Sequence, residues 1–599
     1  MVERILLSND SWFLAPDVKN SGIKDPYWYE SSWFKKKSKK LIRVTVPNSW
    51  QTLEGLEKYE GVCWYFTRMK TEILKIYLDS KKKLYLKFNG ANYLVDAWCN
   101  GIHLGRNEGG YLPFSFQLKK ETLASILEKD NEEVILSVRV DNTRRHDQIP
   151  EFSCDWFQWG GIYRDVYLEV QPEKGINGCY ITPILRFSKT GLLESASIDL
   201  DIKGFKGLNV KWKVTEEDGR EISAGTAELG TSKDQDPNGM SSAKESIEIK
   251  EPKLWDLDNP YRYNLLLQDE NNDVLYESRF GLREIKVEGT SILLNGKSIK
   301  FKGSSLHEEK YPAGREYSRD ERKEDLLDMK SLGFNFLRTA HYSHNESLMD
   351  AADEVGMLIG EEIPVYWDID YKNKKTQKLA VKMLKTLIDR DYNHPSVAWW
   401  SVGNEIPVQK RDCQLFIKML LRYVKKRDKS RICCYVSKNF IADPIRKHSD
   451  ILAFNGYLGW YYFSERMWSF AIELIHGSQK EKPLVVTEFG AGAKLGFGRY
   501  KKVNEKFSEW KQASILSQAI RSFNSKPFVA GWLIWIYRDF KSHMRLNKYQ
   551  EGYNRKGIVD ENGSKKIAGV WMPKLSRQRH SYSKIATIGA LFLAKVLKP

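Results

Sequence analysis

The sequence lacks the features that would place it in a membrane, in a disulfide scaffold or around a structural metal. Its seven cysteines include no Cys-x-x-Cys pair, and the adjacent Cys433 and Cys434 lie in an apolar run typical of a buried strand. No apolar stretch approaches the ~20 residues that a membrane-spanning helix needs. The opening residues, MVERILLSNDSWF, contain no apolar core of a signal peptide. We therefore expect a cytoplasmic protein with no zinc site and no membrane partner.

A concentrated patch of one charge sign is also missing. The formal net charge is +17, from 95 Lys and Arg against 78 Asp and Glu. Such a balance is compatible with nucleic acid, an anionic membrane or an anionic small substrate. The basic residues are scattered among acidic ones, and clusters such as Lys35–Lys37 are typical of loops. Since no nucleic-acid recognition motif is present, we favour a solvated, lysine-rich surface over a nucleic-acid partner.

Strand-like segments dominate the first half of the chain. The 599 residues are enough for about three to four domains. In residues 1–172, short runs with alternating polarity are separated by Gly, Asn and Pro, which predicts a β-sandwich. These runs are Leu41–Pro47, Lys83–Gly90, Tyr93–Gly101, Val134–Asn142 and Asp165–Val170.

Residues 173–284 form a second, shorter zone of the same kind. Segments such as Val210–Glu217 and Tyr261–Asp269 alternate, which fits a small immunoglobulin-like sandwich. The polar stretch Thr231–Ser246 is predicted to be a long loop.

From about residue 285 to 599 the pattern changes to strands separated by amphipathic helices. Continuous apolar strands alternating with helices predict a parallel (β/α)8 barrel of the TIM type. The eight strand candidates are Ile299–His307, Phe334–Tyr342, Met357–Pro364, Val397–Glu405, Ile432–Ser437, Ile451–Tyr457, Leu484–Gly490 and Val529–Tyr537.

Polar side chains stand at the carboxyl ends of most of these strands. Active sites of such barrels lie at that end, so we expect the groups to converge on one polar pocket. They are His307-Glu308-Glu309, Arg338 and His341, Glu361-Glu362, Asn404-Glu405, Asn455 and Tyr457, Glu488 and Trp535.

Glu405 and Glu488, on the fourth and seventh strands, would face each other across the barrel mouth. Two carboxylates ~5–5.5 Å apart suit a retaining glycosidase, in which one attacks the anomeric carbon and the other serves as acid and base. The acid/base must be partly desolvated, so that its pKa lies above that of the nucleophile, which stays ionised. An apolar wall of Val397, Trp399 and Trp400 is expected to help at Glu405.

At these residues the chain resembles glycoside hydrolase family 2 over nearly its whole length. The likeness rests on motifs in the right order rather than on any single one. The resemblance implies a jelly-roll sugar-binding sandwich, an immunoglobulin-like sandwich and a TIM barrel, with Glu405 as acid/base and Glu488 as nucleophile. The motifs are VPNSWQ (Val46–Gln51), Tyr59–Arg68, Val95–Phe116, Asp155–Leu168, Leu254–Tyr263, Phe280–Ile285, Asp389–Glu405 and TEFGA (Thr487–Ala491).

Within the family, the chain is most similar to the β-glucuronidases. The segment Phe454–Tyr461 is similar to the one that carries their active-site tyrosine, here Tyr457. The sequence YNRKG contains an Asn-x-Lys element, Asn554 and Lys556, with which glucuronidases hold the substrate carboxylate. An ammonium and an amide two residues apart can bind both oxygens of a uronic acid by charge-assisted hydrogen bonds.

The resemblance assigns further site residues one by one. Asp155 and Asn404 would bind sugar hydroxyls, Trp535 would form the floor, and His307 and His341 would line the pocket. The arginine that assists carboxylate binding in many glucuronidases has no unambiguous counterpart: Arg545 and Gln550 are the candidates. The third strand ends in Glu-Glu-Ile-Pro, unlike the magnesium-using galactosidases, so no metal or other cofactor is expected.

The expected activity is retaining hydrolysis of small β-glucuronides. A β-galactosidase or β-galacturonidase of the same family remains an alternative, favoured if Lys556 points away from the pocket. A non-catalytic carbohydrate-binding protein is a remote one, because both carboxylates are present. The resemblance implies a homodimer or homotetramer.

Overall fold

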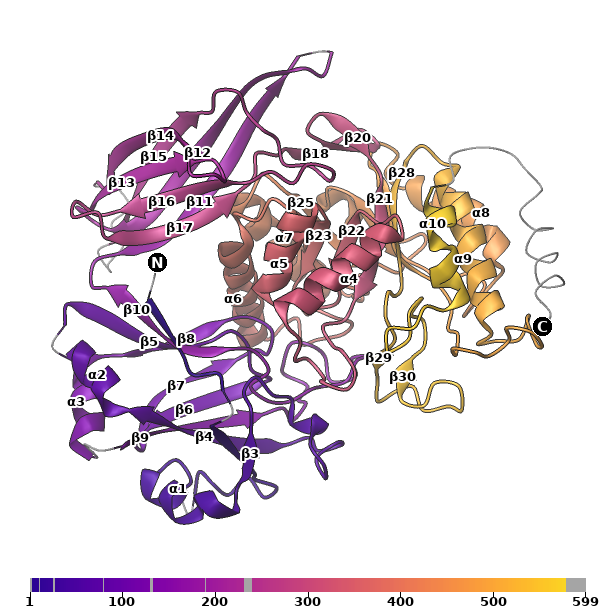
Figure 1. The fold of residues 1–599 in the computed structure, drawn as a ribbon. Coiled ribbons are helices and arrows are strands. Elements are labelled where there is room, and N and C mark those ends of the chain that lie inside the picture. Colours follow the sequence, from indigo (N-terminus) through magenta and orange to yellow (C-terminus); the bar gives the residue numbers. More distant parts are fainter. Residues whose placement is uncertain are drawn as a thin grey trace.

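The computed structural model describes residues 3–9, 11–24, 27–78, 80–129, 133–188, 190–230 and 240–577. Two β-sandwiches lie on one side of a helix-wrapped barrel, the first drawn in indigo and the second in magenta (Figure 1). Helices α8 Trp468–His476, α9 Glu509–Asn524 and α10 Ile567–Ser576, in orange and yellow, lie on the far side of the barrel from both sandwiches (Figure 1). The predicted combination of two sandwiches and a TIM barrel is confirmed.

The first sandwich packs a sheet of order β1-β10-β5-β8 against one of order β3-β2-β4-β9-β6-β7. Alternation is visible in β5, where Leu84, Leu86 and Phe88 are buried between the sheets. Its strands are β1 Glu3–Leu6, β2 Trp12–Pro16, β3 Ile42–Val44, β4 Val62–Lys70, β5 Lys82–Phe88, β6 Leu94–Cys99, β7 Ile102–Glu108, β8 Phe114–Leu118, β9 Glu133–Asp141 and β10 Val166–Pro172; its helices are α1 Ser31–Lys37, α2 Thr71–Leu78 and α3 Lys120–Lys129.

The second sandwich packs β11-β12-β15 against β14-β13-β16-β17. The prediction of a loop over Thr231–Ser246 is wrong at its end: Met240–Glu248 forms β15, because its short polar residues pair along β12. Residues 231–239 lie outside the described part of the chain. The strands are β11 Ile176–Phe187, β12 Leu193–Phe205, β13 Asn209–Thr215, β14 Glu221–Glu228, β15 Met240–Glu248, β16 Tyr263–Gln268 and β17 Val274–Phe280.

The barrel closes through eight parallel strands, β21 to β28 in sequence order, as predicted. Nearly every residue in them is buried, which explains their continuous apolar runs. They are β21 Phe301–Leu306, β22 Phe336–Thr339, β23 Leu358–Glu362, β24 Val397–Asn404, β25 Ile432–Ser437, β26 Leu452–Asn455, β27 Leu484–Phe489 and β28 Val529–Ile534.

Helices cover the outside of the barrel (Figure 1). None of the helices in the described ranges combines the length and apolar character needed to span a bilayer. The helices around the barrel are α4 Arg319–Ser331, α5 Glu346–Val355, α6 Lys374–Asp391, α7 Arg411–Arg427, α8 Trp468–His476, α9 Glu509–Asn524 and α10 Ile567–Ser576. A small sheet of β18 Ile285–Glu288, β19 Ser291–Leu294 and β20 Lys297–Ile299 precedes the barrel, and the pair β29 Phe540–Lys541 and β30 Tyr553–Asn554 follows β28.

A buried ion pair ties the first sandwich to the barrel. Arg164 Nη2 donates to Glu308 Oε2 at 2.5 Å and to the carbonyl of Ser343 at 2.9 Å. The side chains of Arg164 and Glu308 are 1% and 0% exposed. Burial raises the pKa of Glu308, but Arg164, His344 and Arg322 outweigh burial and lower it to about 2. The stabilisation from this pairing is therefore present above the ordinary glutamate pKa and is lost as pH falls toward 2.

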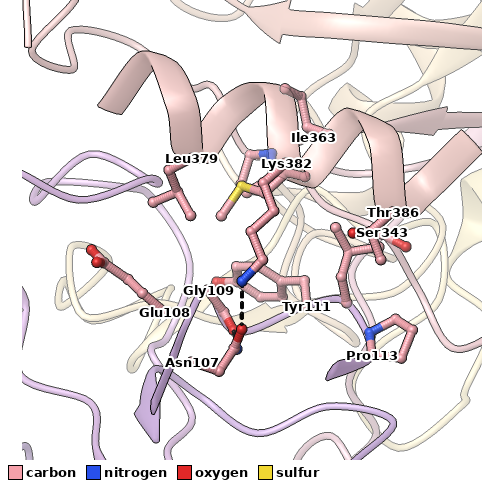
Figure 2. A pocket seen from close by; sticks show the side chains of 13 residues that line it. Asn107, Glu108, Gly109, Tyr111, Pro113, Ser343, Ile363, Leu379, Lys382 and Thr386 are labelled. Carbon is pink, nitrogen blue, oxygen red and sulfur yellow. Dashed lines mark hydrogen bonds between the residues drawn. The ribbon is translucent and has the colours of Figure 1, made fainter. Parts of the chain in front are cut away.

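A second contact between the same two parts surrounds a small cavity. Figure 2 shows Lys382 of α6 reaching from the barrel to Asn107 of β7, whose side-chain oxygen accepts a hydrogen bond at 2.9 Å. The cavity beside this bond has a volume of about 20 Å³. Because that is room for about one water molecule, it is a packing gap rather than a ligand site.

We expect Arg164→Met to destabilise the protein by about 3–5 kcal/mol, because it removes the shorter of the two buried arginine contacts of Glu308 and leaves only Arg322 at 3.2 Å. The measurement is urea unfolding at pH 7. Lys372→Met is the control: Lys372 and Asp412 lie 3.3 Å apart with side chains 77% and 43% exposed, and such pairs contribute about 0–1 kcal/mol. Equal, small effects of both changes would contradict the assigned role of the buried pair.

Candidate active site

The carboxyl ends of the barrel strands form a polar site that is completed from elsewhere in the chain. The connection between β9 and β10 of the first sandwich brings in Asp155, and β30 brings in the Asn-x-Lys element. Every predicted site residue is joined to this cluster by the contacts described below. The predicted residues are Asp155, His307, His341, Asn404, Glu405, Tyr457, Glu488, Trp535, Asn554 and Lys556.

Glu488, at the end of β27, is held on both carboxylate oxygens. Arg338 Nη1 donates to Oε1 at 2.8 Å, and the Tyr457 hydroxyl donates to Oε2 at 2.6 Å. His341 Nε2 lies 3.8 Å from Oε1. Two donors, one of them the Arg338 guanidinium, fix the orientation of this carboxylate, which suits a nucleophile.

Arg338 of β22 is a fully buried guanidinium that links several site residues. Nη2 lies 3.0 Å from both oxygens of Glu362 and donates to Asn404 Oδ1 at 2.8 Å. Burial raises the pKa of Glu362, but Arg338 and His341 outweigh burial and lower it. The pair Arg338–Glu362 therefore remains charged and supplies a rigid base for Glu488 and Asn404.

Glu405, the last polar residue of the β24 strand end, is held by different partners. Asn455 Nδ2 donates to Oε1 at 3.0 Å, and Trp367 Nε1 donates to Oε2 at 3.2 Å. The Thr487 hydroxyl donates to Asn455 Oδ1 at 2.8 Å, which turns the Asn455 amide nitrogen toward Glu405. Glu405 has φ 50°, a left-handed conformation that is uncommon for such residues and is typical of functional sites.

The expected apolar wall at Glu405 is wrong. Trp399 packs on Phe336 with ring centroids 4.5 Å apart, deep in the barrel, and Trp400 points outward and donates to Asp428 at 2.8 Å. Neither forms a wall at Glu405, because alternate strand residues face opposite sides. Glu488 is also the more buried side chain, 4% exposed against 16% for Glu405.

Burial therefore acts most strongly on Glu488. It raises the pKa of Glu488, and although Arg338 and His341 oppose the rise, the pKa stays above that of an ordinary glutamate. The Tyr457 hydroxyl donates to the same carboxylate and also favours its ionised form. The contacts with Arg338 and Tyr457, rather than solvation, are thus what stabilise a negative charge at this position.

Aromatic rings form the floor of the site. Trp535, which follows β28, stacks on His341 with centroids 4.7 Å apart and meets His307 edge-on at 5.5 Å. Burial lowers the pKa of His307 well below its usual range, so this imidazole is neutral. Flat, half-polar faces of this kind suit the faces of a sugar ring.

One rim of the site is a group of charged and polar residues that we call the carboxylate clamp: Asp155, Tyr461, Arg545, Asn554 and Lys556. Arg545 Nε lies 3.1 Å from both Asp155 oxygens, and Asn554 Nδ2 lies 3.4 Å from Oδ2. Arg545 Nη1 also donates to the Tyr461 hydroxyl at 3.3 Å. Arg545 and Gln550 were the two candidates for the position of the arginine that assists carboxylate binding. Arg545 lies in the clamp, whereas the side-chain oxygen of Gln550 accepts a hydrogen bond from Asn547 at 2.6 Å.

Lys556 points into the clamp, and it is 4% exposed. Its Nζ donates to the Tyr461 hydroxyl at 2.8 Å and lies 5.2 Å from the centre of the Tyr457 ring. Within the described ranges, no carboxylate lies within ion-pair distance of Nζ. Burial raises the pKa of Tyr461, but Lys556 and Arg545 outweigh burial and lower it. Two cations against one Asp155 leave an excess positive charge in the clamp.

Some polar strand ends serve other purposes, and some site residues escaped prediction. Glu308 forms the ion pair with Arg164 of the first sandwich, and Glu309 accepts a hydrogen bond from Trp159 Nε1 at 2.9 Å. Neither side chain therefore belongs to the pocket. Trp367 and Tyr461 were not selected from the sequence. Tyr461 lies in the same quoted segment as Tyr457, four residues on, which was the available signal. Among the described residues, no group of three or more His, Cys, Asp and Glu side chains could hold a metal ion.

Comparison with known proteins gives matches along nearly the whole chain. Residues 285–586 match the TIM barrel domain of glycosyl hydrolases family 2, residues 177–283 match a further model of that family, and residues 7–172 match its sugar binding domain. A β-glucuronidase from Streptococcus agalactiae is 25% identical over 569 residues, 87% of this chain and 89% of the relative. The β-glucuronidase of Rattus norvegicus is 24% identical over 601 residues, 93% of this chain and 88% of the relative.

Solved structures have the same fold. A β-D-glucuronidase from Dictyoglomus thermophilum superposes with a TM-score of 0.81 at 23% identity, covering 97% of this chain and 98% of the other. A β-galacturonidase from Eisenbergiella tayi, bound to galacturonate, gives a TM-score of 0.78 at 23% identity with the same coverage.

We expect Tyr457→Phe to move the acid limb of the kcat/KM profile to higher pH. The Tyr457 hydroxyl stabilises ionised Glu488, so its removal raises the pKa of Glu488 further and less of the carboxylate is ionised at a given pH. The measurement is kcat/KM for an aryl glycoside between pH 4 and 8. Tyr435→Phe is the control, since Tyr435 is also buried and donates to a carboxylate, Asp443, at 2.7 Å away from the site. An acid limb that stays in place or moves down in Tyr457→Phe would contradict this assignment.

Proposed function

The chain belongs to family 2 of the glycosyl hydrolases, and from that membership we propose that it hydrolyses β-D-glucuronides with retention of configuration. A glycoside hydrolase of this family acts on a small-molecule glycoside, and the proposal concerns which glycoside and by which route. The similarity to β-glucuronidases from Streptococcus agalactiae and Rattus norvegicus supports the choice of glycone.

The proposed route is a double displacement. A carboxylate oxygen of Glu488 attacks the anomeric carbon while the bond to the aglycone breaks, and Glu405 gives its proton to the departing oxygen. In the second step Glu405 takes a proton from water, whose oxygen attacks the same carbon and displaces Glu488. Two inversions at one carbon leave the product in the configuration of the substrate.

Asn404 is suited to bind the sugar beside the reacting carbon. Its Oδ1 accepts from both Arg338 at 2.8 Å and Asn455 at 3.1 Å. Within the described parts of the chain its amide nitrogen has no recorded partner, so it can donate to a sugar hydroxyl. A hydrogen bond to the 2-hydroxyl that strengthens in the transition state is a known contribution to glycoside hydrolysis.

The observation that carries the choice of a uronide is Lys556. The buried ammonium of Lys556 donates a hydrogen bond to the Tyr461 hydroxyl, which carries no full negative charge. Burying a cation without an anionic partner costs free energy. The carboxylate of a uronic acid would supply the missing negative charge, with Arg545 nearby. A neutral hexoside would leave Lys556 without an anion, which disfavours a β-galactosidase.

A β-galacturonidase is the second candidate. The clamp would contact the substrate carboxylate, which glucuronides and galacturonides share, and the two differ only at the 4-hydroxyl. The carboxylate of Asp155 accepts from Arg545, Ser542 and Asn554, and none of these contacts favours one epimer at the 4-hydroxyl over the other.

The catalytic assignment predicts the stereochemistry and the loss in two variants. We expect the first product seen by proton NMR to be the β-anomer. Glu405→Gln and Glu488→Gln should each lower kcat by about 10²–10⁴-fold or more, as expected when a positioned acid, base or nucleophile is removed. Glu505→Gln, on an exposed loop, is the control and should retain activity. An α-anomer as first product would overturn the double displacement.

The specificity assignment predicts a selective loss in Lys556→Met. We expect a drop of about 10- to 150-fold in kcat/KM for p-nitrophenyl β-glucuronide, the equivalent of about 1.5–3 kcal/mol for hydrogen bonds to a charged group. Hydrolysis of the matching β-galactoside should change little. Lys548→Met, an exposed lysine on the same loop, is the control.

The panel includes p-nitrophenyl β-galacturonide, which separates the two uronides. A preference for galacturonide that is lost in Lys556→Met would keep the carboxylate clamp and change the glycone. A preference for the galactoside, unaffected by Lys556→Met, would reject the uronide proposal while leaving Glu405 and Glu488 in their roles.

A further inference from the structure

A lysine stands on the side of the site from which the aglycone must leave. Glu405 would protonate the departing oxygen, so the groups around its carboxylate also surround the aglycone. Lys438, directly after β25, has its Nζ 3.7 Å from Glu405 Oε2. Its side chain is 51% exposed, so an incoming substrate can reach it.

Trp367 lies beside this lysine. Its indole Nε1 donates to Glu405 Oε2 at 3.2 Å, and Lys438 Nζ lies 5.9 Å from the centre of the ring system. Trp367 has φ 53°, so its backbone is held in a left-handed conformation that brings the indole to the acid/base. A partly buried indole next to a cation offers one flat face and one positive charge.

Two other lysines near this rim are already paired with carboxylates. Lys410 forms an ion pair with Asp368, and Lys372 lies 3.3 Å from Asp412. Within the described ranges, the carboxylate recorded within ion-pair distance of Lys438 is that of Glu405. When Glu405 carries the proton that it gives to the leaving group, this ion pair is lost and Lys438 needs another anion.

We propose that Trp367 and Lys438 form the aglycone subsite and select an aglycone that carries a carboxylate or sulfate group near the glycosidic bond. This inference rests on the proposed function and adds the class of leaving group to it. Trp367 would contact the face of the first aglycone ring. Lys438 would pair with its anionic substituent while Glu405 is protonated.

The experiment compares two aglycones that differ in charge but have similar phenol acidity: 3-(carboxymethyl)phenyl and 3-(carbamoylmethyl)phenyl β-glucuronide. For the wild type we expect kcat/KM to favour the anionic aglycone by about 2- to 5-fold at low salt, the size of one partly exposed ion pair. The preference should shrink as ionic strength rises, because exposed charges are screened.

The variants are Lys438→Gln and Lys438→Glu. The ratio of the two kcat/KM values should fall to about one in Lys438→Gln and reverse in Lys438→Glu. Taking the ratio within each variant removes any common effect on Glu405. Lys447→Gln, a lysine near the opposite end of the barrel before β26, is the control and should keep the wild-type ratio.

Two results would overturn the inference: a wild-type ratio of one at low salt, or a preference for the anion that persists in Lys438→Gln. If neither glucuronide is cleaved, the proposed glycone fails instead, and the same two aglycones on the glycone that is cleaved test the subsite. A pair of disaccharides with a uronate or a neutral hexose next to the scissile bond then distinguishes an acidic saccharide from an acidic aromatic as the preferred source of the charge.

Discussion

The buried guanidinium of Arg338 joins the parts of the site that have to act together. It contacts Glu488, Glu362 and Asn404, and through Asn404 and Asn455 the chain of hydrogen bonds continues to Glu405. A planar cation with several donors in a fixed geometry can hold two carboxylates and an amide at once, which a lysine cannot. The relative positions of the two glutamates therefore depend on packing that fixes one arginine between strands.

The two ends of the proposed substrate meet different kinds of surface. In the carboxylate clamp the ammonium-bearing Lys556 is buried, and so are Asp155 and Asn554, whereas Tyr461 is exposed. Lys438, on the aglycone side, is half exposed. A buried charged side chain distinguishes charged from neutral substrate groups strongly, whereas a solvent-exposed one does so weakly. The enzyme should thus be highly selective for the glycone and only weakly selective for the aglycone.

Much of the fold and part of the site were predictable from the sequence. The eight barrel strands are continuous apolar runs, and polar residues at their ends mark the mouth, so the sequence predicts that Glu405, Glu488 and Tyr457 lie close together. Trp399 and Trp400 were misplaced because the side toward which a strand residue points depends on barrel geometry. The contacts of Arg545 with Asp155, 390 residues away in sequence, and with Tyr461 could not be predicted, since no local pattern records which distant loops meet.

The contact of Arg545 with Asp155 joins the last barrel loop to the first sandwich across 390 residues of the chain. The catalytic barrel is therefore not a module that evolution can exchange freely. A recombination event that replaced the sandwich with one from a distant homologue would also have to bring a matching aspartate on a loop of the same reach. Sandwich and barrel are bound to be inherited together, and substrate preference should change by paired substitutions on both rather than by shuffling either one.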